Sequence, residues 1–165
     1  MSVEVEHAGK LTFVRILSGA LAIGHRPSLR ALAPMHSAGV THVTTVLSRA
    51  EGAEAIGAAV ARRGMNWIWI ELGSTKSLPQ RRRPDIAAAL GAMESALGDG
   101  GRIYLHCSAG IHRTGMIAAA LMFHLGRDET QTRAILAALR PLTAAEVGEA
   151  RFEWARAFAR GAASF

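Results

Sequence analysis

A cysteine and an arginine lie six residues apart where the sequence changes from a strand pattern to a helix pattern. The segment 103–115 is IYLHCSAGIHRTG, with Cys107 directly after an apolar strand and Arg113 just before an apolar helix. A loop that closes onto a helix N-terminus directs several backbone N–H groups at one point and thereby binds anions. In such a setting a cysteine loses its proton more readily and becomes a nucleophile, while an arginine offers a planar pair of donors to two phosphoryl oxygens.

The residues between the cysteine and the arginine are expected to form the anion site. Gly110 lets the backbone adopt a positive φ and approach the anion, and Thr114 can hydrogen-bond the sulfur and stabilise a departing thiolate. His106 ends the strand, so we expect it to shape the loop by hydrogen bonding rather than to carry protons. His112 either lines the pocket or is only solvated. The predicted binding segment is Ser108, Ala109, Gly110, Ile111, His112 and Arg113.

Strand and helix patterns alternate along the chain and predict the layers that hold this loop. Apolar and β-branched runs predict strands at 11–16, 20–24, 42–47, 65–71 and 102–106. Helices are expected at 51–63, 85–97 and 116–125, and capping boxes at Asp128–Gln131 and Thr143–Glu146 predict two more. This order predicts an α/β fold in a single domain, residues 1–165 with a core at 11–160. A mainly parallel central sheet is flanked by helices, and the phosphate-binding loop joins a central strand to a buried helix.

Composition narrows the possible functions. The chain has 165 residues and a formal net charge of +6, which favours anionic partners without selecting one. Cys107 is the single cysteine, so neither an internal disulfide nor a cysteine-based zinc cluster can form. No apolar run approaches the roughly 20 residues of a membrane span, the polar N-terminus is unlike a signal peptide, and a lone thiol suits a reducing compartment. We therefore expect a cytoplasmic protein, with neither a metal nor an organic cofactor.

The segment His106-Cys107-x5-Arg113-Thr114-Gly115 resembles the signature of the cysteine-dependent protein tyrosine phosphatase superfamily. The short chain and the position of the motif two-thirds along it resemble the dual-specificity branch, and the predicted element order fits as well. The resemblance implies hydrolysis of phosphate monoesters through a phosphocysteine intermediate. Cys107 would attack phosphorus, Arg113 and the loop N–H groups would hold the oxygens, and Thr114 would ease departure of the thiolate.

The sequence departs from the family's pattern at the general acid. The family carries an aspartate in a loop upstream of the cysteine, but no aspartate occurs between Met65 and Pro84. Glu71, at the end of a predicted strand, is the preferred candidate. Asp85, at the start of a helix, is an alternative, and the absence of any side-chain acid is a third. The predicted catalytic set is Cys107, Arg113, Thr114 and Glu71.

The predicted substrate is a phosphorylated protein, with phosphotyrosine first and phosphoserine or phosphothreonine as further options. One alternative is a phosphate-binding module without turnover, which the missing aspartate favours. Another is a phosphatase of a phosphoinositide or of an RNA 5′ phosphate. The loop 108–112 has no lysine, which phosphoinositide phosphatases of the superfamily often carry, and no interleaved aromatic and basic residues predict a nucleic-acid partner. The sequence does not predict the oligomeric state.

Three further features have open interpretations. The run 81–83 of three arginines either attracts an acidic substrate or is a solvated charge run. Thr143 is expected to be a plain N-cap rather than a contact at the rim of the site. Trp67 and Trp69 alternate on a strand and therefore share one face, where we expect them to pack in the core.

Overall fold

A six-stranded sheet forms the centre of the structure, a computed structural model that describes residues 2–74, 77–80 and 83–162. The strand order is β1-β2-β3-β6-β4-β5. Strands β3, β6, β4 and β5 pair in parallel, whereas β1 and β2 extend the sheet through antiparallel pairing. The prediction of a single α/β domain with a mainly parallel sheet is therefore confirmed. The sequence analysis did not predict β1, whose residues are mostly exposed and carry no apolar alternation.

The elements follow one another along the chain as strands and helices with short connections. The strands are β1 (Val5–Ala8), β2 (Leu11–Ile16), β3 (Gly19–Gly24), β4 (His42–Val46), β5 (Asn66–Ile70) and β6 (Arg102–His106). The α-helices are α1 (Leu32–Ser37), α2 (Ala53–Arg62), α3 (Pro84–Gly98), α4 (His112–His124), α5 (Glu129–Leu139), α6 (Pro141–Glu146) and α7 (Glu149–Ala162). Two short 3-10 turns, η1 (Leu29–Ala31) and η2 (Arg49–Glu51), precede α1 and α2. None of the described helices is long and apolar enough to cross a membrane.

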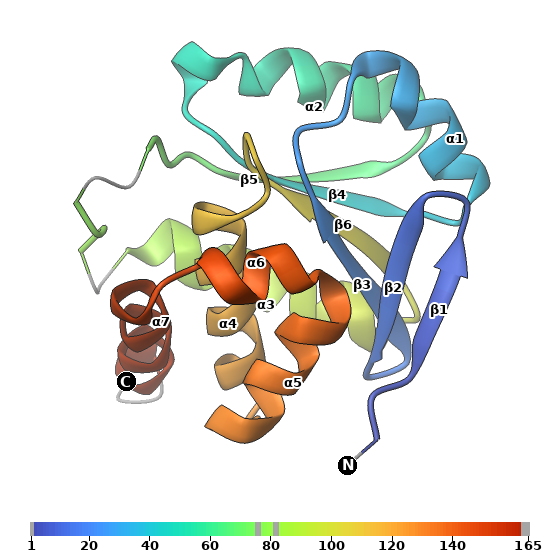
Figure 1. The fold of residues 1–165 in the computed structure, drawn as a ribbon. Coiled ribbons are helices and arrows are strands. Elements are labelled where there is room, and N and C mark those ends of the chain that lie inside the picture. The colour runs from blue at the N-terminus through green and yellow to red at the C-terminus, as the bar shows by residue number, and fades with distance from the viewer. Residues whose placement is uncertain (1, 75–76, 81–82, 163–165) are drawn as a thin grey trace.

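The helices cover the two faces of the sheet unequally (Figure 1). Helices α1 and α2 lie over one face, where Leu32 and Ile56 belong to the smaller of two buried clusters. Helices α3, α4, α5, α6 and α7 gather on the other face, over the larger cluster. Both faces of the parallel strands are thus shielded from water, which explains why these strands are apolar runs rather than alternating ones.

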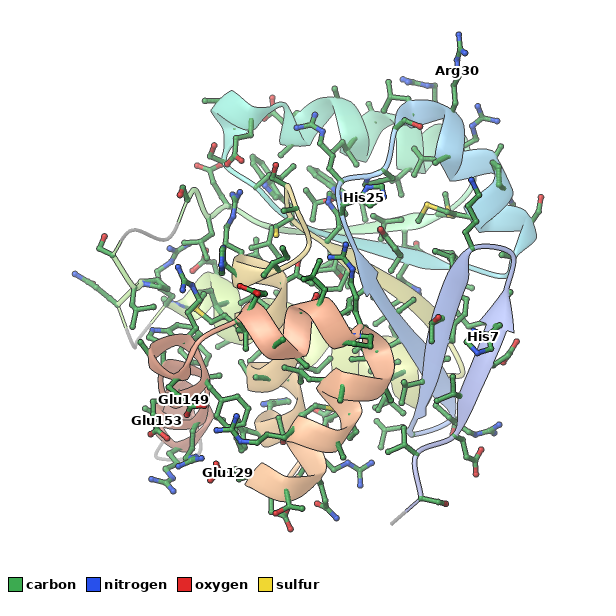
Figure 2. All side chains as sticks on the ribbon, in the orientation of Figure 1. His7, His25, Arg30, Glu129, Glu149 and Glu153 are labelled. Carbon is green, nitrogen blue, oxygen red and sulfur yellow. The ribbon has the colours of Figure 1, made fainter. Side chains whose placement is uncertain are left out.

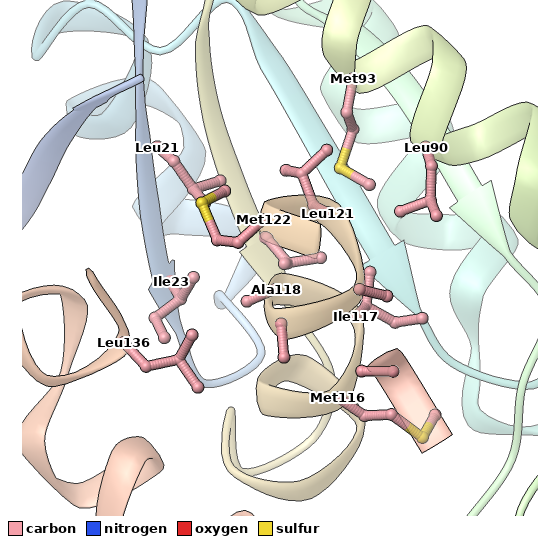
Figure 3. Packing of buried hydrophobic residues seen from close by; sticks show 14 of the residues in the cluster. Leu21, Ile23, Leu90, Met93, Met116, Ile117, Ala118, Leu121, Met122 and Leu136 are labelled. Carbon is pink, nitrogen blue, oxygen red and sulfur yellow. The ribbon is translucent and has the colours of Figure 1, made fainter. Parts of the chain in front are cut away.

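Helix α4 lies at the centre of the larger layer, and every residue from Arg113 to Met122 is buried. Figure 3 shows its side chains packed between β3, α3 and α5. The labelled residues of α4 are Met116, Ile117, Ala118, Leu121 and Met122, and their labelled neighbours are Leu21 and Ile23 of β3, Leu90 and Met93 of α3, and Leu136 of α5. The helix begins at His112, four residues before the predicted start at Met116. The hydrophobic pattern missed this first turn because its residues belong to a polar pocket rather than to the core.

Two other helix starts differ from the sequence prediction. Helix α2 begins at Ala53 because Gly52 has a left-handed φ of 87°, which assigns Glu51 to the separate turn η2. The capping box of Asp128 and Gln131 is confirmed at the start of α5. The capping box predicted at Thr143 is wrong: Pro141 begins α6, so Thr143 lies inside that helix.

Candidate active site

The carboxyl ends of the parallel strands meet at one edge of the sheet, where ligands of open α/β sheets bind. Strand β6 ends at His106, which pairs with Gly24 of β3 on one side and with Thr45 of β4 on the other. The segments that follow these three strands, and the one that follows Ile70 of β5, therefore come together at this edge. Four separate parts of the chain can contribute to one site there.

Cys107 is the first residue after β6 and lines a cavity of about 400 Å³ at this edge, with 3% of its surface exposed. The structure brings five of the predicted residues into the lining of this cavity. It adds Ser74 and Arg151, which the sequence analysis did not single out. The described lining residues are Ser74, Cys107, Ser108, Ala109, His112, Arg113 and Arg151. Gly110 and Ile111, the other two predicted binding residues, belong to the same loop but are not in this lining.

Every carbonyl of the loop 107–111, here called the phosphate loop, accepts a hydrogen bond from another group. The Cys107 carbonyl accepts one from His106 Nδ1 at 2.9 Å, and the Ser108 carbonyl accepts one from the Arg26 N–H at 2.8 Å. The Ile111 carbonyl accepts the N–H of Gly115 at 2.9 Å, within the first turn of α4.

The remaining two carbonyls are held by the junction of α5 and α6. Arg140 Nη1 donates to the carbonyls of Ala109 and Gly110 at 2.9 and 3.0 Å. The Thr143 hydroxyl donates to the Gly110 carbonyl at 2.6 Å. Thr143 therefore contacts the loop directly, which corrects its expected role as a plain N-cap.

Gly110 is required where the loop passes the end of β3. Its φ is +72°, and a Cβ atom there would lie 2.2 Å from the carbonyl carbon and oxygen of Gly24. No other residue combines that backbone conformation with so close an approach. The loop is thus pressed against β3 as well as hydrogen-bonded from outside.

This arrangement sets the direction of the loop N–H groups. A peptide unit is planar, and its C=O and N–H point in opposite directions. Because the carbonyls of 107–111 are bonded outside the cavity, the N–H groups that follow them face inward. Among the described residues, none accepts a hydrogen bond from the N–H groups of 108–113. Together with the N-terminus of α4 they can act as a cradle for an anion beside Cys107.

Arg113 is 7% exposed and is fixed by a carboxylate that the sequence analysis missed. Its Nη1 and Nη2 donate to the two carboxylate oxygens of Glu51 at 2.8 and 3.0 Å, and Nη1 also donates to the Leu72 carbonyl at 2.9 Å. The Nε–H and one Nη2–H have no acceptor among the described residues. These two donors lie on one edge of the guanidinium and match two phosphate oxygens.

Glu51 is itself held in place from η2. The Ser48 N–H and hydroxyl both donate to it, at 3.0 and 2.9 Å. The hydrogen bonds from Arg113 lower the pKa of Glu51 to about 2, so the carboxylate stays ionised at neutral pH. The Ser48-x-x-Glu51 spacing is a capping-box signal that could have been recognised in the sequence, although its partner Arg113 could not.

A buried chain of hydrogen bonds supports the loop from the sheet side. Trp67 Nε1 donates to Thr45 Oγ1 at 2.9 Å, and Thr45 Oγ1 lies 2.8 Å from His106 Nε2. Since the indole can only donate, the Thr45 hydroxyl accepts from it and donates to His106. His106 must then carry its proton on Nδ1, which donates to the Cys107 carbonyl. Burial lowers the pKa of His106 to about 4, which keeps the ring neutral and preserves this tautomer.

Thr114 is fully buried, and its hydroxyl has no hydrogen-bond partner among the described residues. The predicted hydrogen bond to the Cys107 sulfur is therefore not formed in this structure. A buried hydroxyl without a partner is costly, and a role for it at the reacting sulfur stays a prediction.

The two candidate acids lie outside the described lining of the cavity. Glu71 is exposed directly after β5, and its carbonyl accepts a hydrogen bond from Arg83 Nη2 at 3.0 Å. Asp85 is in the first turn of α3 and forms an ion pair with Arg83, which lowers the Asp85 pKa and makes Asp85 a poor proton donor. The other two arginines of the run, at 81 and 82, lie outside the described residues. The general acid therefore stays a prediction.

Residues 30–134, which include the phosphate loop, match the sequence model of the tyrosine phosphatase family. The chain belongs to the tyrosine phosphatase family. It is thus a phosphatase of the cysteine-dependent class that acts on phosphate monoesters, as the signature at 106–115 implied. Comparison with curated proteins gave no match.

Solved phosphatase structures share the fold of this tyrosine phosphatase family member. PTPMT1 in complex with PI(5)P is 14% identical with a TM-score of 0.74, over 92% of this chain and 97% of that one. Kinase associated phosphatase, with its catalytic cysteine replaced by serine, is 13% identical with a TM-score of 0.73, over 100% and 98% of the two chains. TpbA of P. aeruginosa is 20% identical with a TM-score of 0.55, over 90% and 83%. At these identities the similarity shows a shared fold.

The two adjacent threonines of β4 give a matched test of the buried hydrogen-bond chain. Thr45→Val should lower the free energy of unfolding by about 1–3 kcal/mol, because it leaves Trp67 Nε1 and His106 Nε2 buried without partners. It should also slow the alkylation of Cys107 by iodoacetamide, because His106 can then change tautomer and release the loop carbonyl. Thr44 is equally buried, but its hydroxyl has no partner among the described residues, so Thr44→Val should cost nothing. Urea unfolding and alkylation rates check both variants; equal behaviour would contradict the role given to Thr45.

The low pKa of His106 predicts an acid-sensitive stability. Above pH 6.5 the imidazole is neutral in both folded and unfolded chains, so its contribution is constant. Between pH 6.5 and about 4, His106 binds a proton in the unfolded chain but stays neutral in the folded chain. The free energy of unfolding should therefore fall across this window, by about 3 kcal/mol in total. Urea unfolding at pH 7, 6, 5 and 4.5 measures the fall. His106→Gln should flatten it, and a wild-type curve that is level across the window would contradict the assignment.

Proposed function

We propose that this chain is a protein phosphatase that hydrolyses phosphotyrosine, and phosphoserine or phosphothreonine as further substrates, through a phosphocysteine intermediate on Cys107. The observation that carries the proposal is the phosphate loop, whose carbonyls are all bonded outside the cavity. Cys107 and Arg113 line the same cavity as residues of this loop, which supports an oxyanion site between them. Family membership makes phosphate monoesters the substrate class of that site.

The first step transfers the phosphoryl group to sulfur. Three phosphate oxygens bind the loop N–H groups and the Nε and Nη2 donors of Arg113, which places phosphorus in line with Cys107. The S–P bond forms as the P–O bond to the substrate breaks, and the electron pair of that bond passes to the leaving oxygen. A general acid, Glu71 in our proposal, gives that oxygen its proton.

The second step restores the enzyme. A water molecule attacks phosphorus, the S–P bond breaks, and inorganic phosphate leaves with the oxygen of the water. The carboxylate that lost its proton in the first step accepts one from the water. Cys107 departs as a thiolate, and the hydroxyl of Thr114 is proposed to stabilise it.

Glu51 makes Arg113 effective without taking part in the transfer. Its carboxylate occupies the far edge of the guanidinium, so the near edge is already oriented when phosphate arrives. Preorganised donors of this kind need no rearrangement during the reaction, which is the main source of their catalytic effect. Because the pKa of Glu51 is lowered to about 2, the carboxylate stays ionised and gives this support at neutral and mildly acidic pH.

The substrate beyond the phosphate is less constrained by the site. His112, Ser74 and Arg151 line the cavity around the loop and offer polar contacts to the leaving group. PTPMT1 was solved with PI(5)P, and a phosphoinositide substrate is an alternative here. The loop 108–112 provides no lysine for further phosphates, so we favour a phosphorylated protein. An initial-rate panel of phosphotyrosyl and phosphoseryl peptides, phosphoinositides and RNA ends would decide between them.

Two substitutions test the mechanism at the phosphate loop. Cys107→Ser should abolish turnover yet keep phosphate binding, because the serine hydroxyl stays protonated while the cradle is unchanged. Arg113→Lys should reduce kcat/KM by roughly 10²–10³-fold, since a lysine cannot present two parallel donors. Initial rates on p-nitrophenyl phosphate and equilibrium binding of phosphate measure both effects. Residual turnover above a few per cent in Cys107→Ser would contradict the phosphocysteine intermediate.

A leaving-group comparison tests the general acid. Glu71→Gln should slow hydrolysis of phosphotyrosyl peptides by roughly 10²–10⁴-fold and remove the basic limb of the pH–rate profile. It should hardly affect an activated substrate such as a fluorinated coumarin phosphate, whose leaving group needs no proton.

Asp85→Asn is the matched control, because Asp85 already forms an ion pair with Arg83 and should show no leaving-group dependence. If Asp85→Asn showed the dependence instead, the assignment to Glu71 would be wrong. If neither variant showed it, the enzyme would use water as the acid or would depend on substrates that need no acid.

A further inference from the structure

A second cavity shares no lining residue with the cavity beside Cys107, and Arg140 in its lining contacts the phosphate loop. It has a volume of about 650 Å³ and is bounded by the β1–β2 turn, α1, the end of β3 and the C-terminal end of α5. Most of its lining is apolar, including Leu11, Ile23, Pro34, Met35 and Leu139. Cavities of this size and composition bind small molecules in other proteins. We call it the rear groove.

The charges around the rear groove favour an anion. Its lining includes Lys10 and Arg140, and the described lining has no carboxylate. His25 and Arg30 also line the rear groove, and Figure 2 shows the end of the Arg30 side chain extending into solvent. Arg140 is therefore the cation placed nearest the loop, and Lys10 lies at the turn of the hairpin.

Arg140 connects the rear groove to the phosphate loop. It is only partly exposed, and Nη1 holds the carbonyls of Ala109 and Gly110. Its Nε–H and Nη2–H groups have no acceptor among the described residues. A carboxylate in the rear groove can therefore bind these donors while Nη1 keeps its bonds to the loop, since a guanidinium carries five N–H groups.

A second connection passes through Tyr104, which also lines the rear groove. Its hydroxyl donates to the His25 carbonyl at 2.7 Å, and the next N–H, that of Arg26, donates to the Ser108 carbonyl. Burial raises the pKa of Tyr104 to about 12, so the hydroxyl stays a donor. The backbone at Gly24 packs closely against Tyr104, since a Cβ at Gly24 would lie 2.4 Å from the Tyr104 hydroxyl oxygen.

We propose that the rear groove binds an anion of the fatty-acid type, with its apolar chain along the groove and its carboxylate on Arg140. The bound anion fixes Arg140, which holds two carbonyls of the phosphate loop, and Tyr104, which holds the His25 carbonyl next to the Arg26 N–H that binds a third. It thereby stabilises the form of the loop that binds phosphate. Because binding effects between two sites are reciprocal, an oxyanion in the cradle must tighten binding in the rear groove by the same factor.

The experiment uses laurate, below its micelle-forming concentration, and vanadate as the oxyanion of the cradle. Isothermal titration of the full chain should show one saturable laurate site, and saturating vanadate should tighten it by roughly fivefold. Lauryl alcohol, which has the same chain without the charge, should bind far more weakly. If the alcohol bound as well as laurate, Arg140 would not be the head-group site.

Two alanines provide matched variants that leave the catalytic residues untouched. Ala38 lines the rear groove, and Ala38→Glu should weaken laurate binding about tenfold by placing a carboxylate beside the anion. Ala58 is exposed on α2 and does not line the groove, so Ala58→Glu should bind laurate normally. Absent or non-saturable binding, or equal binding by the two variants, would overturn the site. Competition between laurate and vanadate would place laurate in the cradle, and independent binding would break the link to the loop; either result overturns the proposal.

Discussion

The site depends on one constraint: the carbonyls of five consecutive residues must all be bonded away from the cavity. A free peptide loop can turn either its N–H groups or its carbonyls toward a ligand. Here each carbonyl from Cys107 to Ile111 accepts a hydrogen bond from a donor outside the cavity. Those donors come from β6, the segment after β3, the α5–α6 junction and α4. The sheet and the helices therefore act on the chemistry by fixing where five hydrogen-bond donors stand, and the anion cradle is the consequence.

The charged side chains of the site are also held by hydrogen bonds from residues outside the cavity. Arg113 keeps one edge of its guanidinium available because Glu51 and the Leu72 carbonyl occupy the other. Arg26 connects the phosphate loop to the turn that carries Glu51. Its N–H donates to the Ser108 carbonyl, and its guanidinium donates to the carbonyl of Glu51. A shift of η2 would therefore disturb both the loop and the arginine. This shared anchoring explains why a short turn after β4, far from the cysteine in sequence, belongs to the active site.

The sequence predicted the parts of the site that are contiguous and missed those that the sheet brings together. Cys107 and Arg113 were recognisable because strand, loop and helix follow within a dozen residues. Glu51 lies 62 residues from Arg113, and Thr45 lies 61 residues from His106. Their contacts depend on strand order and on the register that places Thr45 opposite His106, neither of which a local pattern contains. Thr143 was misassigned for a related reason: its spacing to Glu146 fits a capping box, but Pro141 starts the helix earlier.

The same geometry limits how the phosphate loop can respond to its surroundings. Three of its five carbonyl anchors, at Ser108, Ala109 and Gly110, depend on Arg26 and Arg140, whose neighbours Tyr104, His25 and Gly24 line the rear groove. The other two depend on the ring of His106 and on the N–H of Gly115, both of which are buried and lie outside the lining of the rear groove. A molecule bound outside the cavity can therefore act on the middle of the loop but not on its ends. Since Cys107 and Arg113 flank this middle part, under our proposal we expect such a molecule to change how firmly the cradle holds phosphate while the side chains of Cys107 and Arg113 keep their positions.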